Sequence, residues 1–228
     1  MQIIAHRGAW NVPQAPQQPN SLEAFNQALV HHWGIEVDIR DYKGELRVSH
    51  NPADENSLPL SVLLDSYQAH KSTACIAFNI KADGLQPLLQ QQVEQYHIKH
   101  YFTFDMSIPN TIVDNQFGLP FFLRQSEFEQ SLQHLGQLYQ LCKGLWIDQF
   151  EEDERVLAYN LLSISNHLKA DKQICFVSPE LHPWGKQEQQ YLKVWLKLKN
   201  LLNDLGNPNI YLCTDYPKQA EEYFNARD

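Results

Sequence analysis

Short apolar runs recur along this chain with the spacing typical of strands that alternate with helices. A strand that is buried on both faces is a continuous apolar run of about four to eight residues, bounded by polar or turn-forming residues. Eight segments have this character, at residues 2–5, 35–39, 74–80, 101–104, 119–123, 145–147, 174–177 and 210–213.

Between several of these runs, apolar positions repeat with the period of an amphipathic helix. The clearest helical stretches are residues 21–31, 60–70, 85–96, 154–168 and 187–205. Strands that alternate with helices predict parallel βα units. No Gly/Ser-rich or charged linker divides the chain. We therefore expect one domain over residues 1–228, an α/β fold of the single (β/α)8 TIM-barrel type.

The fourth and fifth units fit this pattern least well. Pro109 and Pro120 stand in a segment with little helical periodicity. Because proline interrupts helices and strands, we expect a short or irregular connection there.

The second predicted strand carries the first sign of chemistry. Side chains alternate faces along a strand, so Glu36 and Asp38 share one face while Ile35, Val37 and Ile39 share the other. Two carboxylates held together in a half-buried strand repel each other unless a cation lies between them, and hard oxygen ligands select magnesium or calcium. This spacing predicts a divalent cation, Mg²⁺ or Ca²⁺, at Glu36 and Asp38.

Two histidines are expected near this pair. His6 and Arg7 follow the first predicted strand, at the carboxyl end where parallel strands place ligand-binding groups. The Lys43-Gly44 turn predicts a β-hairpin after the second strand, which brings His50 back toward the carboxylates. Two histidines, an arginine and a cation can supply acid, base and electrostatic stabilisation for attack on phosphorus.

Several motifs together resemble the glycerophosphodiester phosphodiesterase family, of the PLC-like phosphodiesterase superfamily. They are His6-Arg7-Gly8, Pro19-Asn20-Ser21-Leu22-Glu23-Ala24-Phe25, Glu36-Val37-Asp38, Arg47-Val48-Ser49-His50 and Phe78-Asn79-Ile80-Lys81. Ser178-Pro179-Glu180-Leu181-His182 and Cys213-Thr214-Asp215 are similar to late-strand ends of a small bacterial-type branch. The resemblance implies a TIM barrel, a divalent cation, and hydrolysis of a phosphodiester to an alcohol and a phosphomonoester, with His6 and His50 as the acid and base pair.

The chain departs from the family pattern at three places. Gln18-Pro19-Asn20-Ser21 stands where the family has Pro-Glu-Asn-Thr, Asn79 replaces a glutamate that ligates the cation, and Asn51 replaces an aspartate after the histidine of the hairpin. An amide oxygen still ligates magnesium or calcium but brings no charge. Asn79 is therefore expected as a weak third ligand, and Lys81, on the same alternating face, as a second group for the phosphate beside Arg7.

Polar residues recur at the ends of the other predicted strands. Because strand ends of a barrel meet at one rim, Asp105, Glu180 and His182 are candidate pocket residues. Strand ends are also polar simply because the chain leaves the core there. Trp184 is expected either as an apolar wall of the pocket or as a surface aromatic on a loop.

Composition excludes several partners. With 18 Lys and Arg against 27 Asp and Glu, the formal charge is -9, which argues against binding to nucleic acid or to an anionic membrane. No apolar stretch approaches the roughly 20 residues that span a bilayer. We expect a cytoplasmic protein whose partner is a small phosphodiester. Cys75, Cys142, Cys175 and Cys213 lack zinc-site spacing and are expected as buried free thiols.

The sequence thus predicts a metal-dependent phosphoric diester hydrolase for a glycerophosphodiester or a related sugar or cell-envelope phosphodiester, with a role in lipid metabolism. Which histidine is the acid, and whether water or a substrate hydroxyl attacks, stays open. Two alternatives also stay open. One is a phospholipase D-like enzyme that forms a cyclic phosphate, and the other is a phosphate-ester-binding barrel with weakened turnover.

Overall fold

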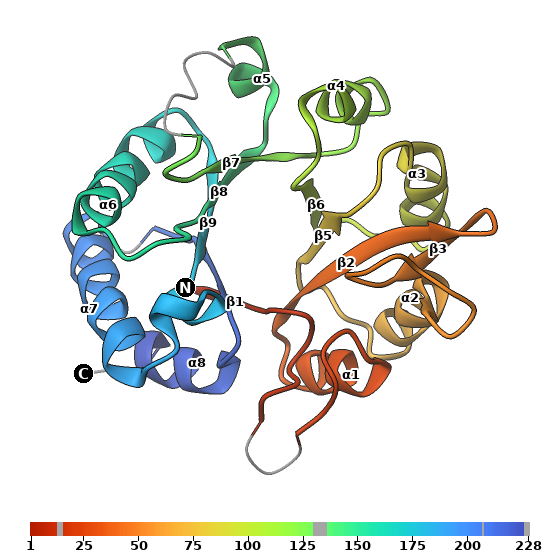
Figure 1. Ribbon diagram of the computed structural model, residues 1–228, viewed down its shortest axis with the longest axis horizontal. Helices are drawn as coiled ribbons and strands as arrows, with labels where there is room; N and C mark the ends of the chain where they lie inside the picture. Colours follow the sequence, from red (N-terminus) through yellow and green to blue (C-terminus); the bar gives the residue numbers. More distant parts are fainter. Residues whose placement is uncertain (13–15, 130–135, 207, 226–228) are drawn as a thin grey trace. The chain divides into compact units, whose positions relative to one another are not determined.

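A computed structural model describes residues 1–12, 16–129, 136–206 and 208–225 of the chain (Figure 1). The chain divides into two compact units. The N-terminal unit is Ile4–Phe121, and the C-terminal unit comprises Met1–Ile3 and Phe122–Asp228. A single domain over residues 1–228 stays a prediction.

Parallel strands form the sheet of the N-terminal unit, and they lie at predicted positions. β1 (Gln2–Ala5) pairs with β2 (Gly34–Tyr42), β2 with β5 (Ile76–Ile80), and β5 with β6 (Tyr101–Phe104). Beyond β6, Phe121 forms a parallel bridge with Thr103. The carboxyl ends of β1, β2 and β5 therefore lie side by side in this unit.

The second strand continues into the predicted hairpin. β2 pairs antiparallel with β3 (Glu45–Val48), which also pairs with β4 (Leu58–Pro59). Lys43 and Gly44 both have positive φ, 51° and 82°, as a tight two-residue turn requires. Just past β3, the Ser49 N–H donates to the Asp38 carbonyl at 3.0 Å. The hairpin is confirmed, and it brings the chain back beside the acidic strand.

Three predicted helices of this unit are present. They are α1 (Leu22–Val30), α2 (Leu60–Ala69) and α3 (Gln86–Gln95), which lie along one side of the unit's strands in Figure 1. Ser21 caps α1, since its hydroxyl accepts from the Ala24 N–H at 3.2 Å. The apolar positions that gave the helical pattern are the buried ones, among them Phe25 and Leu29.

The fourth unit differs from the prediction. Residues 108–116 form a regular helix, α4 (Ile108–Gln116), rather than an irregular connection. Pro109 stands in the first turn, where a missing N–H costs nothing. Ser107 caps the helix by accepting from the Asn110 N–H at 3.4 Å. The proline that looked like a helix breaker is therefore part of the helix start.

Parallel strands also form the sheet of the C-terminal unit, in the order β10, β9, β8, β7. Their bounds are β7 (Phe122–Gln125), β8 (Gly144–Ile147), β9 (Gln173–Val177) and β10 (Tyr211–Thr214). Each overlaps a predicted strand. The start of the chain joins this unit through the Gln2 N–H, which donates to the Ile210 carbonyl at 2.9 Å.

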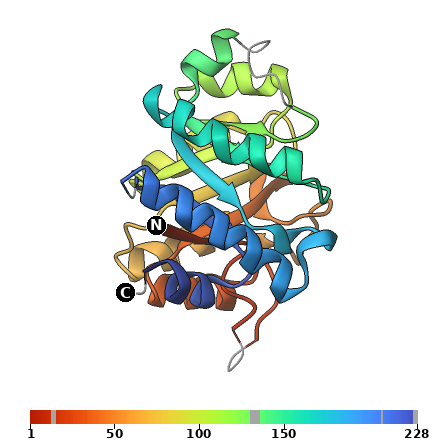
Figure 2. The same ribbon diagram turned by 90° about the vertical axis from the view of Figure 1, so that its left-hand side faces the viewer.

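Two long helices of the C-terminal unit were predicted within one residue of their bounds. α6 (Glu154–Lys169) and α7 (Glu188–Asp204) are neighbours in both Figure 1 and Figure 2. Lys193 and Lys197 of α7 each bind the Glu154 carboxylate at 2.5 Å. The other described helices are α5 (Gly136–Leu141), η2 (Pro179–Leu181), η3 (Pro183–Gly185) and α8 (Pro217–Asn225). Residues 130–135 of the fifth unit's connection lie outside the described residues, so the short or irregular connection expected there stays a prediction.

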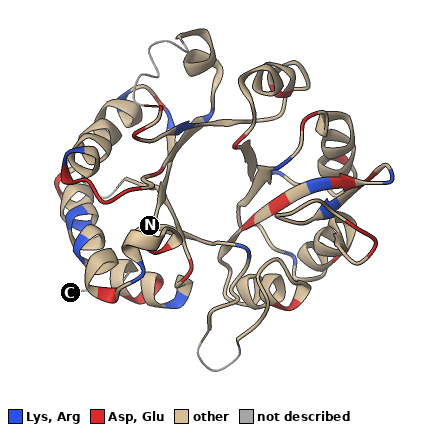
Figure 3. Cartoon of the chain, in the orientation of Figure 1, with Lys and Arg blue, Asp and Glu red and all other residues tan. Residues whose placement is uncertain are grey.

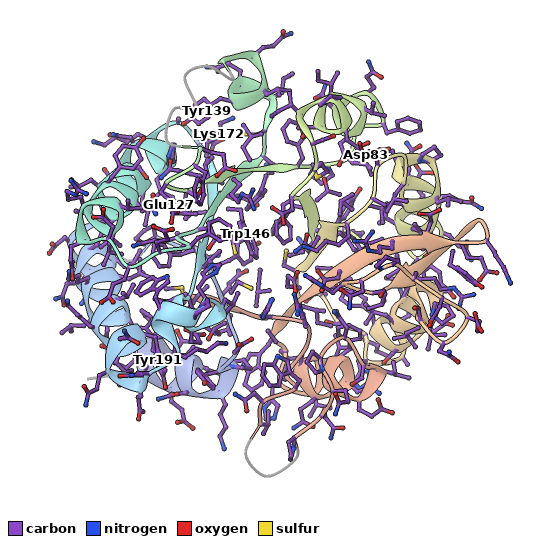
Figure 4. The ribbon with its side chains drawn as sticks, viewed as in Figure 1. Asp83, Glu127, Tyr139, Trp146, Lys172 and Tyr191 are labelled. Carbon is purple, nitrogen blue, oxygen red and sulfur yellow. The ribbon has the colours of Figure 1, made fainter. Side chains whose placement is uncertain are left out.

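A buried polar cluster ties helices of the C-terminal unit to β7. His167 of α6 contacts Gln125 Oε1 through Nε2 at 2.9 Å, and its Nδ1 lies 2.9 Å from the Tyr139 hydroxyl. Tyr139, labelled in Figure 4, also lies under the Lys172 ammonium, 5.4 Å from the ring centre. Burial lowers the pKa of His167. This histidine is occupied within the core of the unit.

The predicted environment of the cysteines is confirmed, since Cys75, Cys142, Cys175 and Cys213 are all buried and none is in a disulfide. Among the described residues, no helix combines the length and the apolar character that a membrane span requires.

Candidate active site

The N-terminal unit brings most of the predicted site residues together. Glu36 and Asp38 lie on one face of β2, at 1% and 0% relative exposure. In the parallel register, Asp38 is the partner of Asn79 on β5, so these two side chains emerge side by side from adjacent strands. Figure 3 shows acidic segments along β2, with a basic segment toward its carboxyl end. The expected carboxylate face therefore exists and is buried.

Glu36 is held from three sides. The Arg7 backbone N–H donates to Oε2 at 3.0 Å, the Asn79 amide donates to Oε1 at 3.0 Å, and His6 Nε2 lies 3.9 Å from Oε2. Burial raises the pKa of Glu36, and the neighbouring Asp38 charge raises it further, against the opposing effects of His6, Asn79 and Arg7. A positive charge beside Glu36 would relieve this cost.

Asp38 is surrounded by donors and cations. Its Oδ2 accepts from the Asn20 amide at 2.8 Å and forms an ion pair with Arg7 Nε at 3.0 Å. Lys81 Nζ lies 3.5 Å from Oδ1, an ion-pair contact without hydrogen-bond alignment, so Oδ1 has no hydrogen-bond partner. The same ammonium is 3.4 Å from Asp105 Oδ2. Lys81 therefore bridges two carboxylates and joins Asp105 to the site.

The backbone around His6 is shaped to deliver these contacts. Arg7 and Gly8 have positive φ, 55° and 82°. A Cβ at Gly8 would lie 2.8 Å from the Ala24 carbonyl carbon, so only glycine lets this turn pack on α1. The turn points the Arg7 N–H at Glu36, which gives the His-Arg-Gly motif a physical basis.

Asn20 belongs to the site although no role was predicted for it. It adopts φ of 60°, donates its backbone N–H to the Arg7 carbonyl at 2.9 Å, and donates its amide to Asp38. The available signal was an asparagine directly before the Ser21 cap, since asparagine tolerates the left-handed conformation and can hydrogen-bond from it.

His50 stands at the end of the hairpin, directly after Ser49, whose N–H contacts the Asp38 carbonyl. The His50 side chain is exposed, and its Nδ1 lies 3.3 Å from Asn51 Oδ1. Its carbonyl accepts from Arg40 Nε at 3.1 Å. The backbone on either side of the exposed ring is thus bonded to β2, the strand that carries the carboxylates.

The donor set fits a divalent cation. Three oxygens of this site, Asn20 Oδ1, Asp38 Oδ1 and Asn79 Oδ1, are buried without a hydrogen-bond partner. The Asn79 amide nitrogen faces Glu36, which can only accept, so its carbonyl oxygen remains available. Among the described residues, no three His, Cys, Asp or Glu side chains form a metal-type cluster. Any cation held here would therefore use Glu36 and Asp38 with the amide oxygen of Asn79.

The remaining candidate residues belong to the C-terminal unit. Glu180 is fully buried, and it accepts from Ser178, Thr214 and the Asp215 N–H, so both of its oxygens are used within the unit; its place in a pocket stays a prediction. Burial raises its pKa.

His182 and Trp184 of this unit are partly exposed. His182 Nε2 lies 2.7 Å from Asp148 Oδ1, and its ring packs on Phe150. The Trp184 Nε1–H donates to the Gln149 carbonyl at 3.0 Å. Trp184 also lines a hollow of about 230 Å³ beside α6 and α7, and its role as a pocket wall stays a prediction.

Comparison with known proteins supports the fold. No family model matches the chain, and no curated protein matches its sequence. A glycerophosphodiester phosphodiesterase from Parabacteroides distasonis is similar in structure, with TM-score 0.71, 16% identity, and coverage of 98% of this chain and 96% of that one.

Two further solved structures agree. A phosphodiesterase from Oleispira antarctica, in complex with the product sn-glycerol-3-phosphate, matches with TM-score 0.67 and 14% identity, over 99% of this chain and 97% of that one. A glycerophosphodiester phosphodiesterase from Agrobacterium tumefaciens matches with TM-score 0.64 and 14% identity, over 99% and 100%. The chain has the (β/α)8 TIM-barrel fold of these glycerophosphodiester phosphodiesterases, as its sequence predicts.

Proposed function

We propose that this chain is a phosphoric diester hydrolase, and that it uses a divalent cation, Mg²⁺ or Ca²⁺. The observation that carries the proposal is the buried pair Glu36 and Asp38, set between the cations Arg7 and Lys81 and next to His6. Fold alone does not define a reaction. The arrangement of charges supports one, because a phosphodiester needs cations for its non-bridging oxygens, a base for the attacking water and an acid for the leaving bridging oxygen.

In the proposed reaction, Arg7 and Lys81 bind the non-bridging oxygens of the phosphate. One of His6 and His50 takes a proton from the attacking water as its oxygen bonds to phosphorus. The other gives a proton to the leaving alcohol as the phosphorus–oxygen bond breaks. The products are an alcohol and a phosphomonoester.

Neighbouring residues set the positions of these groups. The Arg7 turn is fixed by its N–H bond to Glu36, and Asp105 contacts the Lys81 ammonium at 3.4 Å as a second carboxylate beside Asp38. A divalent cation held by Glu36, Asp38 and Asn79 supplies further positive charge for the phosphate oxygens.

The proposed substrate is a glycerophosphodiester or a related small sugar or cell-envelope phosphodiester. Support comes from the Oleispira antarctica phosphodiesterase, which holds sn-glycerol-3-phosphate as product. A phosphomonoester of a small polyol has the charge and size that Arg7 and Lys81 can bind. The cytoplasmic location and the role in lipid metabolism stay predictions.

The test is hydrolysis of bis(p-nitrophenyl) phosphate and of a small glycerophosphodiester panel, in magnesium, manganese, calcium or chelator. His6→Ala and His50→Ala should each lower turnover roughly 10²–10⁴-fold if these side chains act as acid and base. His100→Ala is the matched control, because His100 is an exposed histidine of the same unit. Near-normal turnover in both site variants would end this mechanism.

Product analysis separates the remaining alternatives. A cyclic phosphate product would identify the phospholipase D-like reaction with an internal hydroxyl as nucleophile. Phosphate-ester binding without turnover in any cation, by protein shown to be folded, would identify a binding barrel.

A further inference from the structure

Before any ligand binds, cations already neutralise most of the negative charge of this site. Three carboxylates, the buried Glu36 and Asp38 and the part-exposed Asp105, face two cations. Arg7 and Lys81 both contact Asp38, at 3.0 Å and 3.5 Å. The third position, Asn79, supplies an amide in place of a charge. A divalent cation entering this site alone would meet two positive groups and gain little uncompensated negative charge, so its binding to the free protein should be weak.

The same site nevertheless contains oxygens that accept no hydrogen bond. Asp38 Oδ1 and Asn79 Oδ1 are buried without hydrogen-bond partners, and they come from paired positions of adjacent parallel strands. Buried acceptors without partners are costly and therefore rare. Their presence together shows where a cation would gain ligands once the charge balance changes.

A phosphate ester changes that balance. When its oxygens take Arg7 and Lys81, the contacts that now neutralise Asp38 weaken, and the carboxylate pair gains unbalanced negative charge. The phosphate oxygens also provide cation ligands, and magnesium is commonly held by one or two carboxylates together with substrate phosphates.

We propose that the divalent cation and the phosphate ester bind to this site as a pair, each weak alone and each strengthening the other. The inference rests on the proposed function, because it assumes that the site takes a phosphate ester. Thermodynamic linkage requires the effect to be reciprocal. If the ester raises magnesium affinity by some factor, magnesium raises ester affinity by the same factor.

Lys81 gives the inference an unusual consequence. Its ammonium lies 3.5 Å from Asp38 Oδ1, the oxygen that accepts no hydrogen bond. Lys81→Met should therefore strengthen magnesium binding in the absence of ester, while it weakens binding of the ester itself. A lysine with a purely supporting role would not move the two affinities in opposite directions.

The experiment is calorimetric titration of the full chain with Mg²⁺, in the presence and absence of sn-glycerol-3-phosphate, together with the converse titration of the ester with and without Mg²⁺. Blank titrations correct for the association of magnesium with the ester in solution. We expect affinity for each to rise at least about tenfold when the other is present, a change typical of coupled sites.

Asn79→Asp is the decisive variant, since it keeps the shape of the side chain and adds the missing charge. It should bind magnesium without ester at least about tenfold more tightly than the wild type, with the coupling correspondingly reduced. Asn115→Asp, at an exposed position of α4, adds the same charge away from the site and should leave both affinities unchanged. Circular dichroism shows whether each variant is folded. If Asn79→Asp is not folded, the test uses Lys81→Met instead.

The outcomes distinguish the inference from the proposed function. Tight magnesium binding by the wild type without ester, unaffected by adding it, would overturn the inference while leaving the hydrolase intact. Ester binding that is indifferent to magnesium would overturn it as well. A wild-type protein that is folded but binds neither ligand would overturn both.

Discussion

Replacing Glu36 by glutamine should stabilise the ligand-free protein at neutral pH while weakening the proposed binding of a divalent cation. Glu36 is 1% exposed, and its pKa is raised by burial first and by the Asp38 charge second. A carboxyl whose pKa rises on folding favours the folded state below its unfolded pKa, and that contribution is lost as pH rises through the folded pKa. At pH 7.5 the ionised group therefore costs stability, and glutamine removes the charge with little change of shape.

The size of the effect follows from the strand. Side chains two residues apart on one strand face are separated by roughly 6.6 Å, and at an effective dielectric of about 20 two like charges at that distance repel by about 2.5 kcal/mol. Glutamine can keep only one of the two bonds that Glu36 accepts from the Arg7 N–H and the Asn79 amide. That loss, together with the lost attraction to Arg7, offsets about 1.5 kcal/mol. The net gain is about 1 kcal/mol, or a rise in Tm of about 2–4 °C for a chain of this size.

Urea denaturation in chelator at pH 7.5 and pH 4.5 provides the assay. The free energy of unfolding of Glu36→Gln should exceed that of the wild type at pH 7.5, and the difference should shrink at pH 4.5, where the wild-type carboxyl is more protonated. Glu94→Gln makes the same chemical change at an exposed position of the same unit and should show neither effect. A site variant less stable than the wild type at pH 7.5, or a difference that does not depend on pH, would refute the reasoning.

Three further changes test other parts of the structure. Gly8→Ala should lower the free energy of unfolding by about 2–4 kcal/mol in urea titration, because the position has positive φ and a Cβ would collide with the α1 backbone; an equally stable variant contradicts this account. Asn20→Ala should cost about 1–3 kcal/mol through the lost bond to Asp38, and Asn20→Gly should cost about 1 kcal/mol less, since glycine accepts φ of 60° freely. His167→Gln should flatten the pH dependence of the free energy of unfolding between about pH 7 and 5. The lowered pKa of His167 makes the wild type lose stability as pH falls through that range. Parallel curves of unfolding free energy against pH for the two proteins would contradict this expectation.

The sequence predicted strands and helices well where the apolar period is long or uninterrupted. β1 and β6 match their predicted bounds, and α6 differs by one residue at its C-terminal end. The prediction for the fourth unit was wrong. It treated Pro109 as a helix breaker, whereas Pro109 lies in the first turn of α4. Position within a helix decides what a proline does, and the sequence pattern alone did not fix the position of the Ser107 cap.

The candidate site was predictable where residues share a strand and less so where they meet through a loop. Alternation along β2 was enough to place Glu36 and Asp38 on one face. Nothing in periodicity indicated that Asn20, in a left-handed conformation before α1, would donate to Asp38. That contact depends on how the turn after β1 folds back, which is a tertiary property.

The charges around Glu36 and Asp38 do not fit an ion-pair network whose role is structural alone. Such a network gains stability when geometry and hydrogen bonds satisfy every member, and a partly satisfied network is worse than an apolar core. Here Asp38 and Asn79 each keep a buried oxygen without a hydrogen-bond partner, and the pKa of Glu36 is raised. A site that served stability alone would gain from replacing these groups with apolar ones. This cost is what we expect of carboxylates and cations held in place for the proposed ligands, a metal ion and a phosphate ester.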